Sequence, residues 1–212
     1  MRLTEMRLPG VLLLEPRVFR DGRGFFVETW NRERYAAAGL EVSFVQDNVS
    51  SSRRGVLRGL HFQNPTPQGK LVSVLHGAVF DVAVDLRVGS PTFAGWLGVD
   101  LSADNLRQLY IPEGFAHGFL VTSDTAVFSY KCTAPYAPEY ERSVRWDDPE
   151  LGVQWPYMDP VLSAKDRSAP PLRDIPAEYL FYAPLGSSHV EPLGAQADHL
   201  SIRPAAVNSH ET

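Results

Sequence analysis

Short apolar segments separated by turn residues run along most of the chain. The clearest is segment 78–86, in which period-two alternation puts four large apolar side chains on one face and Asp81, Ala83 and Asp85 on the other. Seventeen prolines and sixteen glycines divide the chain into further segments rich in Val, Phe, Tyr and Leu. This rhythm of strands and turns is typical of a β-sandwich or β-barrel. The pattern therefore predicts an all-β protein.

The same pattern sets the expected elements. Besides 78–86, strands are predicted at 11–15, 25–29, 43–49, 56–63, 70–76, 96–101, 107–111, 118–122 and 126–132. A helix is predicted at 31–38, because Asn31 can cap its first turn and Gly39 can end it. A second short helix is predicted at 176–179.

Length and composition indicate one globular domain. The chain has 212 residues, which fits a single domain. From about Pro184 the composition shifts to Gly, Ser, Ala, Pro and isolated charges. We therefore expect one domain at 1–183, followed at 184–212 by a tail that is poorly ordered.

Composition also excludes several classes of protein. Hydrophobic residues make up 44% of the chain and charged residues 21%, which excludes a wholly disordered chain. The net charge of −5 argues against a general nucleic-acid binder, although basic residues can still gather around an anionic ligand. No segment approaches the roughly 18 apolar residues of a membrane span. The single cysteine, Cys132, excludes an internal disulfide, and we expect a cytoplasmic protein.

Two histidine motifs narrow the fold. Segment 55–63 (GVLRGLHFQ) has the spacing of the first cupin motif, and segment 112–117 (PEGFAH) has the core of the second. Together, in this order, they predict a small cupin-type jelly-roll barrel with a few short helices. A cupin metal site needs a second histidine in the first motif and a glutamate shortly after it. Here Gln63 takes the histidine position and no carboxylate stands near Gln68, so no metal is expected.

A polar cluster in the first motif nevertheless indicates a functional site. Five basic or carboxamide side chains of interest fall within thirteen residues of a predicted strand and the turn after it: Arg58, His61, Gln63, Gln68 and Lys70. Burying so many polar groups without a use is costly. A functional site is therefore favoured over the alternative of a hydrogen-bonded core histidine.

Several motifs together resemble the dTDP-4-dehydrorhamnose 3,5-epimerase family. They are the segments 19–28 (FRDGRGFFVE), 46–50 (QDNVS), 55–63, 68–72 (QGKLV), 90–93, 112–119, 130–131, 155–156 and 163–166. The resemblance covers roughly 8–172. It implies a jelly-roll homodimer without cofactor or metal. It also implies conversion of dTDP-4-dehydro-6-deoxy-D-glucose to dTDP-4-dehydro-L-rhamnose, with a dTDP-sugar as substrate and no nucleic-acid or membrane partner.

This reaction sets chemical requirements. The C4 ketone acidifies C3 and C5, and inversion needs a base on one face, an acid on the other and a positive group at the enolate oxygen. His61 suits the base, because imidazole titrates at about 6.5. The resemblance implies Asp166 as its orienting partner, Tyr130 as the acid and Lys70 as the enolate stabiliser. On the sequence alone, Asp166 would be a turn or cap residue and Tyr130 would equally suit the core.

The resemblance also implies a set of substrate-binding residues. Arg23 and Arg58 would bind the two phosphates, because arginine matches phosphate oxygens with a planar fork. Tyr136 would stack on thymine. The remaining substrate-binding residues would be Phe26, Glu28, Gln46, Asn48, Lys70, His117, Glu141 and Lys165. Strict alternation puts Arg58 and His61 on opposite faces, whereas a β-bulge at Gly59 would bring both inward; the sequence leaves this open.

Other functions remain as alternatives. A metal-dependent cupin dioxygenase would bind its metal at His61 and His117. A catalytically silent sugar-binding cupin would show a break in the set of His61, Lys70 and Tyr130, which is intact. Within the family, an enzyme of another dTDP-deoxysugar pathway would invert only C3 or only C5. The sequence does not separate single from double inversion.

Overall fold

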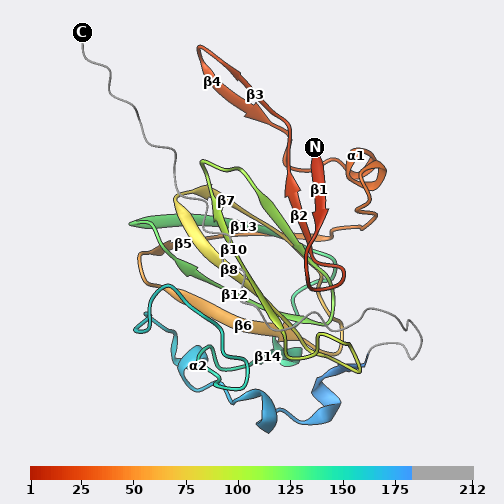
Figure 1. Ribbon diagram of the computed structural model, residues 1–212, viewed down its shortest axis with the longest axis vertical. Helices are drawn as coiled ribbons and strands as arrows, with labels where there is room; N and C mark the ends of the chain where they lie inside the picture. The colour runs from red at the N-terminus through yellow and green to blue at the C-terminus, as the bar shows by residue number, and fades with distance from the viewer. Residues whose placement is uncertain (183–212) are drawn as a thin grey trace.

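Two antiparallel β-sheets face each other in the computed structural model, which describes residues 1–182 (Figure 1). The six-stranded sheet has the order β1 (Arg2–Glu5), β2 (Leu12–Glu15), β11 (Gln108–Ile111), β7 (Lys70–His76), β13 (Thr125–Cys132) and β5 (Gln46–Arg53). The five-stranded sheet has the order β10 (Trp96–Ser102), β8 (Ala78–Asp85), β12 (Phe115–Val121), β6 (Leu57–Gln63) and β14 (Glu141–Ser143). The all-β prediction is confirmed. The tail predicted at 184–212 lies outside the described residues.

Smaller elements surround the two sheets. They are the hairpin of β3 (Val18–Asp21) and β4 (Gly24–Val27), the parallel pair of β9 (Arg87–Val88) and β15 (Phe181–Tyr182), helices α1 (Arg32–Ala37) and α2 (Ala164–Arg167), and the 3-10 turns η1 (Pro138–Tyr140), η2 (Leu172–Asp174) and η3 (Ala177–Tyr179). The predicted cap of α1 is confirmed, because the Asn31 side chain accepts a hydrogen bond from the backbone N–H of Arg34. None of the described helices is long and apolar enough to cross a membrane.

Two of the predicted strands are displaced from their expected bounds by three or more residues at one end or both, whereas the other predicted strands differ by at most two. The strand predicted at 43–49 is observed as β5, shifted toward the polar Ser50–Ser52 stretch, because pairing with β13 sets its register. The strand predicted at 118–122 begins earlier, as β12, because residues 115–117 also pair with β8. In both cases tertiary pairing overrides local propensity.

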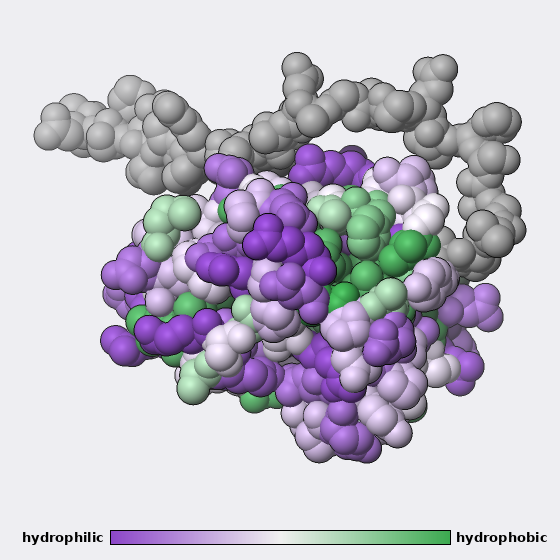
Figure 2. All heavy atoms as spheres, turned by 90° about the horizontal axis from the view of Figure 1, so that it is seen from below, coloured by the Kyte–Doolittle hydropathy of each residue, from purple (hydrophilic) through white to green (hydrophobic). Residues whose placement is uncertain are grey.

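The alternation in β8 is real, but both of its faces are buried. Val79 and Ala83 face the core between the sheets, whereas Phe80, Val82 and Val84 pack against the segment after β14. That segment supplies Val144, Leu151, Val153, Trp155, Leu172 and Ile175 to the outer core. Figure 2 shows the molecule from this side, where most of the surface is hydrophilic. The segment after β14, at 144–175, therefore covers the apolar outer face of the five-stranded sheet.

A β-bulge in β6 resolves the question of Arg58 and His61. His61 pairs with His117 and Arg58 with Phe119, so three steps along β6 oppose two along β12. Gly59 at the bulge has a φ of +134°, and a Cβ there would lie 2.5 Å from the Cα of Gly118. Only glycine fits this conformation and this close approach. The bulge places Arg58 and His61 on the wall of the same cavity.

Candidate active site

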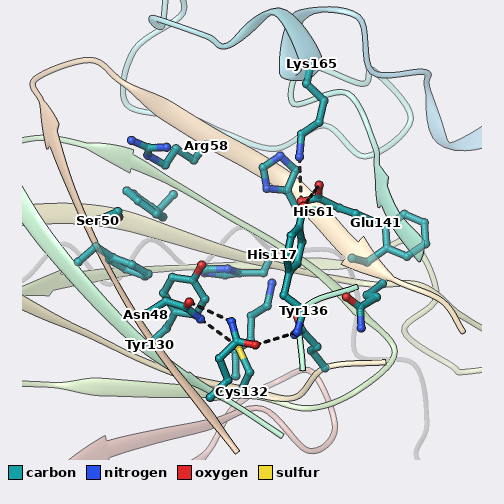
Figure 3. Close-up of a pocket in the computed structure, with 17 residues that line it drawn as sticks. Asn48, Ser50, Arg58, His61, His117, Tyr130, Cys132, Tyr136, Glu141 and Lys165 are labelled. Carbon is teal, nitrogen blue, oxygen red and sulfur yellow. Dashed lines mark hydrogen bonds and ion pairs between the residues drawn. The ribbon is translucent and has the colours of Figure 1, made fainter. Parts of the chain in front are cut away.

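A pocket of about 410 Å³ lies between the sheets and is lined from both of them (Figure 3). Ten of the residues predicted for the site line it: Gln46, Asn48, Arg58, His61, Lys70, His117, Tyr130, Tyr136, Glu141 and Lys165. Figure 3 shows His61 and Lys165 entering from the side opposite Tyr130, Asn48 and Cys132. The pocket can therefore contact a bound molecule from two opposite faces.

His61 is held by a buried carboxylate. Its Nε2 lies 2.5 Å from Oδ1 of Asp166, whose side chain is 3% exposed. Ser163 caps α2 by accepting the backbone N–H of Asp166, and its hydroxyl donates to Asp166 Oδ2 at 2.8 Å. Burial alone would raise the pKa of Asp166, but the hydrogen bonds from His61 and Ser163 and the charge of His61 lower it below its ordinary value. Asp166 is therefore an ionised partner that fixes the imidazole.

His117 forms a second, deeper pair. Its Nε2 lies 2.9 Å from Oδ2 of Asp81, and neither side chain is more than 9% exposed. The other oxygen, Asp81 Oδ1, has no hydrogen-bond partner among residues 1–182. The sequence motifs do not single out Asp81 as a site residue. The available signal was a carboxylate on the inward face of an otherwise apolar strand.

Tyr130 and Lys70 come from the opposite sheet. Tyr130 lies on β13, and burial raises the pKa of its phenol, so the hydroxyl stays protonated at neutral pH. Lys70 opens β7, and burial lowers the pKa of its ammonium below its ordinary value. Both residues line the pocket from the six-stranded sheet, whereas His61 lines it from the five-stranded sheet that faces it.

The pocket is locally cationic in an acidic chain. Its lining includes Arg58, Lys70 and Lys165 but only one carboxylate, that of Glu141, whereas the whole chain has a net charge of −5. Lys165 Nζ lies 2.8 Å from Glu141 Oε1, and Arg58 Nε donates to Ser52 Oγ at 3.1 Å. This excess of positive charge suits an anionic ligand such as a diphosphate.

Tyr136 lies in the loop between β13 and η1, at the edge of the pocket. Its backbone N–H donates to Gln46 Oε1 at 2.7 Å, and its hydroxyl donates to Glu141 Oε2 at 2.9 Å. The side chain is half exposed. Bonds at the backbone and at the hydroxyl hold Tyr136 in place, so its ring presents a flat surface to a planar ligand.

Comparison with known proteins identifies the family. The family model described as dTDP-4-dehydrorhamnose 3,5-epimerase matches residues 5–174. The chain belongs to this family. A dTDP-4-dehydrorhamnose 3,5-epimerase from Pseudomonas aeruginosa is 57% identical over 176 residues, which cover 82% of this chain and 97% of the relative.

Solved structures agree with this assignment. The dTDP-6-deoxy-D-glucose-3,5-epimerase from Legionella pneumophila, in complex with dTDP-4-keto-L-rhamnose, is 50% identical with a TM-score of 0.83, covering 86% of this chain and 98% of that one. A 3'-monoepimerase from Streptomyces bikiniensis, in complex with dTDP-quinovose, is 38% identical with a TM-score of 0.75, covering 82% and 88%. The predicted family, cupin-like fold and 3,5-epimerase activity in dTDP-rhamnose biosynthesis are confirmed.

Three residues expected at the site lie elsewhere in this epimerase chain. Arg23, Phe26 and Glu28 lie on or beside the β3–β4 hairpin, which projects away from the two sheets (Figure 1). The Arg23 side chain is 91% exposed and pairs with Asp21, whereas Glu28 pairs with Arg34 at 2.6 Å. A single chain therefore does not bring these three residues to the pocket.

The two pocket histidines do not sit in a larger group of metal ligands. Within residues 1–182 there is no cluster of three or more His, Cys, Asp or Glu side chains arranged to hold a metal ion. His61 and His117 each direct one ring nitrogen to an aspartate. Gln63, which stands at the position of the second cupin histidine, bonds to backbone groups instead.

Proposed function

We propose that the epimerase activity of this family runs here by proton transfer from the substrate to His61 and from Tyr130 to the substrate. The observation that carries the proposal is the origin of these residues on facing sheets, β6 and β13, across one pocket. Inversion of a carbon requires proton removal from one face and proton return on the other. A base and an acid on opposite walls supply both steps. The substrate we propose is dTDP-4-dehydro-6-deoxy-D-glucose, and the product is dTDP-4-dehydro-L-rhamnose.

His61 is the base in this proposal. Its Nε2–H donates to Asp166, so the other ring nitrogen carries the free electron pair. That nitrogen takes the proton from C3 or C5. The electron pair of the C–H bond then forms a double bond between that carbon and C4, while the π pair of the C4 carbonyl moves onto its oxygen. The ionised Asp166 stabilises the imidazolium that forms.

Lys70 and His117 stabilise the enolate. The enolate oxygen needs positive charge or hydrogen-bond donors already in place, because such preorganised groups need not reorient as charge develops. Lys70 supplies the ammonium, and Asp81 fixes the ring of His117. Lys70 and His117 both line the pocket, as does Tyr130.

Tyr130 returns a proton from the face opposite His61. The O–H bond breaks, a new C–H bond forms at the same carbon, and the C4 ketone is restored. Solvent then reprotonates the phenolate and takes the proton from the imidazolium, which resets both groups. The raised pKa of Tyr130 favours this role, because a weakly acidic phenol stays protonated until the carbanion forms.

The nucleotide occupies the cationic end of the pocket. Arg58 and Lys165 bind the diphosphate, and the ring of Tyr136 stacks on thymine. Gln46, Asn48 and Glu141 supply polar contacts from β5 and β14.

A homodimer completes the site in this proposal, because the β3–β4 hairpin of a second copy supplies Arg23, Phe26 and Glu28. The hairpin exposes three phenylalanines: Phe19 (49%), Phe25 (54%) and Phe26 (69%). Val49 on β5 and Leu75 on β7 also expose more than half of their surface. Apolar groups so exposed mark an interaction surface.

We also propose a cytoplasmic location, in line with the free thiol of Cys132.

One reaction tests the proposal and the nearest alternative. Incubation with dTDP-4-dehydro-6-deoxy-D-glucose in deuterated water should give the L-rhamno product with deuterium at C3 and C5, read by NMR. Deuterium and inversion at one carbon only would indicate a single-position epimerase, which the similarity to a 3'-monoepimerase keeps in view. Absence of both would contradict the proposed mechanism.

A further inference from the structure

The loop that carries Tyr136 is held by glutamine side chains. Gln63 Oε1 accepts the backbone N–H of Ala137 at 2.8 Å, and Gln63 Nε2 donates to the carbonyl of Pro135 at 3.1 Å. Gln63 therefore binds the residues on both sides of Tyr136. A single carboxamide pairs with a donor and an acceptor two residues apart, as a neighbouring strand would.

Two further glutamines extend this arrangement. Gln68 Nε2 donates to the carbonyl of Ala134 at 2.8 Å, and Gln46 Oε1 accepts the backbone N–H of Tyr136. Each of the four residues at 134–137 thus has a backbone group bonded to a glutamine side chain. The conformation of this loop depends on side chains from β5, from β6 and from the turn before β7.

The Gln63 side chain is buried, and its carboxamide is hydrogen-bonded at both the oxygen and the nitrogen. Its side chain is 4% exposed, and Nε2 also donates to the carbonyl and to the hydroxyl of Thr66. Only a carboxamide of this length can accept from Ala137 while donating to Pro135 and Thr66. A histidine, which the cupin motif predicts at this position, lacks that combination of groups.

We propose that Gln63 and Gln68 are positioning residues for nucleotide binding, acting through the loop that carries Tyr136. The inference rests on the proposed function, in which Tyr136 stacks on the base. A loop fixed before the ligand arrives loses little conformational entropy on binding. Releasing it should weaken nucleotide binding, while the proton-transfer groups on β6 and β13 stay in place.

The test is Gln63→Glu, assayed with dTDP by calorimetry and with the sugar nucleotide by steady-state kinetics. The carboxylate keeps the shape of glutamine but turns the donor toward Pro135 and Thr66 into an acceptor, which leaves those carbonyls unpaired. We expect Kd for dTDP and KM to rise at least about tenfold, with kcat within about twofold of wild type. Gln154→Glu is the matched control, because Gln154 makes one exposed bond to a backbone carbonyl, at Gly152. An unchanged Kd for Gln63→Glu, or an equal loss of kcat, would overturn the proposal.

A double substitution separates this role from general destabilisation. In a Tyr136→Ala background the loop no longer presents a ring, so adding Gln63→Glu should weaken dTDP binding by less than about threefold. If the effects of the two substitutions on the free energy of dTDP binding are fully additive, Gln63 does not act through Tyr136.

If Gln63→Glu does not fold, Gln68→Met provides the test instead, because it removes only the bond to Ala134. A severalfold rise in Kd supports the proposal, and no change contradicts it. Wild-type protein that binds dTDP but does not epimerise would contradict the proposed function and leave this inference standing.

Discussion

His61 and His117 stand opposite each other in the β6–β12 pair, and each is hydrogen-bonded to a buried aspartate from a different element. The two pairs differ in depth: the side chain of His61 is 23% exposed and that of His117 is 9% exposed. A histidine–aspartate pair alone therefore does not select the base. Exposure to the pocket favours His61 for proton removal and His117 for holding the enolate.

His61→Ala should abolish nearly all turnover. General base catalysis contributes about 10² to 10⁴ in rate, so kcat should fall by that factor. Affinity for dTDP, measured by calorimetry, should stay almost unchanged, because the phosphate-binding groups remain. His76→Ala, at the exposed end of β7, is the control. Retention of most of the activity by His61→Ala would refute the role of His61.

Tyr130→Phe should separate proton removal from inversion. Phenylalanine keeps the ring and deletes the hydroxyl, so the packing should change little. In deuterated water the variant should still exchange deuterium into the substrate through His61, while epimerised product falls steeply. NMR of C3 and C5 measures both. Equal loss of exchange and product would indicate a role in binding, and undiminished double inversion would remove Tyr130 from the mechanism.

How far the sequence predicts this structure depends on whether a feature is local. Strands β7 and β8 follow from their own side chains, and the prediction at 70–76 coincides with β7. The second half of β5 does not, because its polar serines form a strand only through pairing with β13. Periodicity also could not place Asp166 beside His61, since 105 positions of sequence separate them.

The same limit applies within the site. Resemblance to the family selected Asp166 and Tyr130, whereas the pattern of residues alone left each with an ordinary structural role. The sequence pattern does not single out Asp81, because its partner His117 lies on a neighbouring strand that only the sheet order identifies. Gln63 stands out in the sequence as a polar residue, but its bonds to the 134–137 loop depend on how β6 meets the end of β13.

Asp166→Asn should change how stability depends on pH. The pKa of Asp166 is lowered from 3.8 in the folded protein, so the folded state binds its proton less readily than the unfolded state. The resulting stabilisation is fully present above the unfolded value and disappears as the pH falls through the folded value. Urea unfolding should therefore show wild type more stable than the variant at pH 7, with the gap narrowing below about pH 4. The exposed Asp104→Asn serves as the control, and a gap independent of pH would contradict the prediction.

Lys70→Met should stabilise the fold while abolishing turnover. Burial lowers the pKa of Lys70, so the folded protein holds the ammonium less favourably than the unfolded chain does. This penalty is present at neutral pH and fades as the pH rises from the folded pKa toward the unfolded one. Methionine removes the charge and keeps a similar length. Thermal unfolding at pH 7 should give a raised Tm. Lys131→Met, which removes an ion pair with Asp47, should give no such rise. A lower Tm or retained activity for Lys70→Met would contradict the proposed role.

Mixing two inactive variants should restore activity if a second copy completes the site. His61→Ala disables the pocket of its own chain, whereas Arg23→Ala disables only the hairpin that we propose enters the partner's pocket. In a mixed dimer, one pocket receives both defects and the other receives neither. Equal mixing with free exchange should therefore leave about a quarter of all sites intact, because half of the dimers are mixed and each carries one intact site.

The matched control is an equal mixture of two single variants, Tyr130→Phe chains and His61→Ala chains. Both defects then lie in the pocket of their own chain, so no combination of chains yields an intact site. Activity should be measured after the dimers have been dissociated, mixed and reassociated, with light scattering to confirm the dimer. Recovery for the Arg23→Ala mixture and none for the control would place the hairpin in the partner's site. If Arg23→Ala alone keeps full activity, Arg23 does not bind the substrate. If Arg23→Ala is inactive and the mixture also stays inactive, the hairpin acts within its own chain and the shared-site proposal fails.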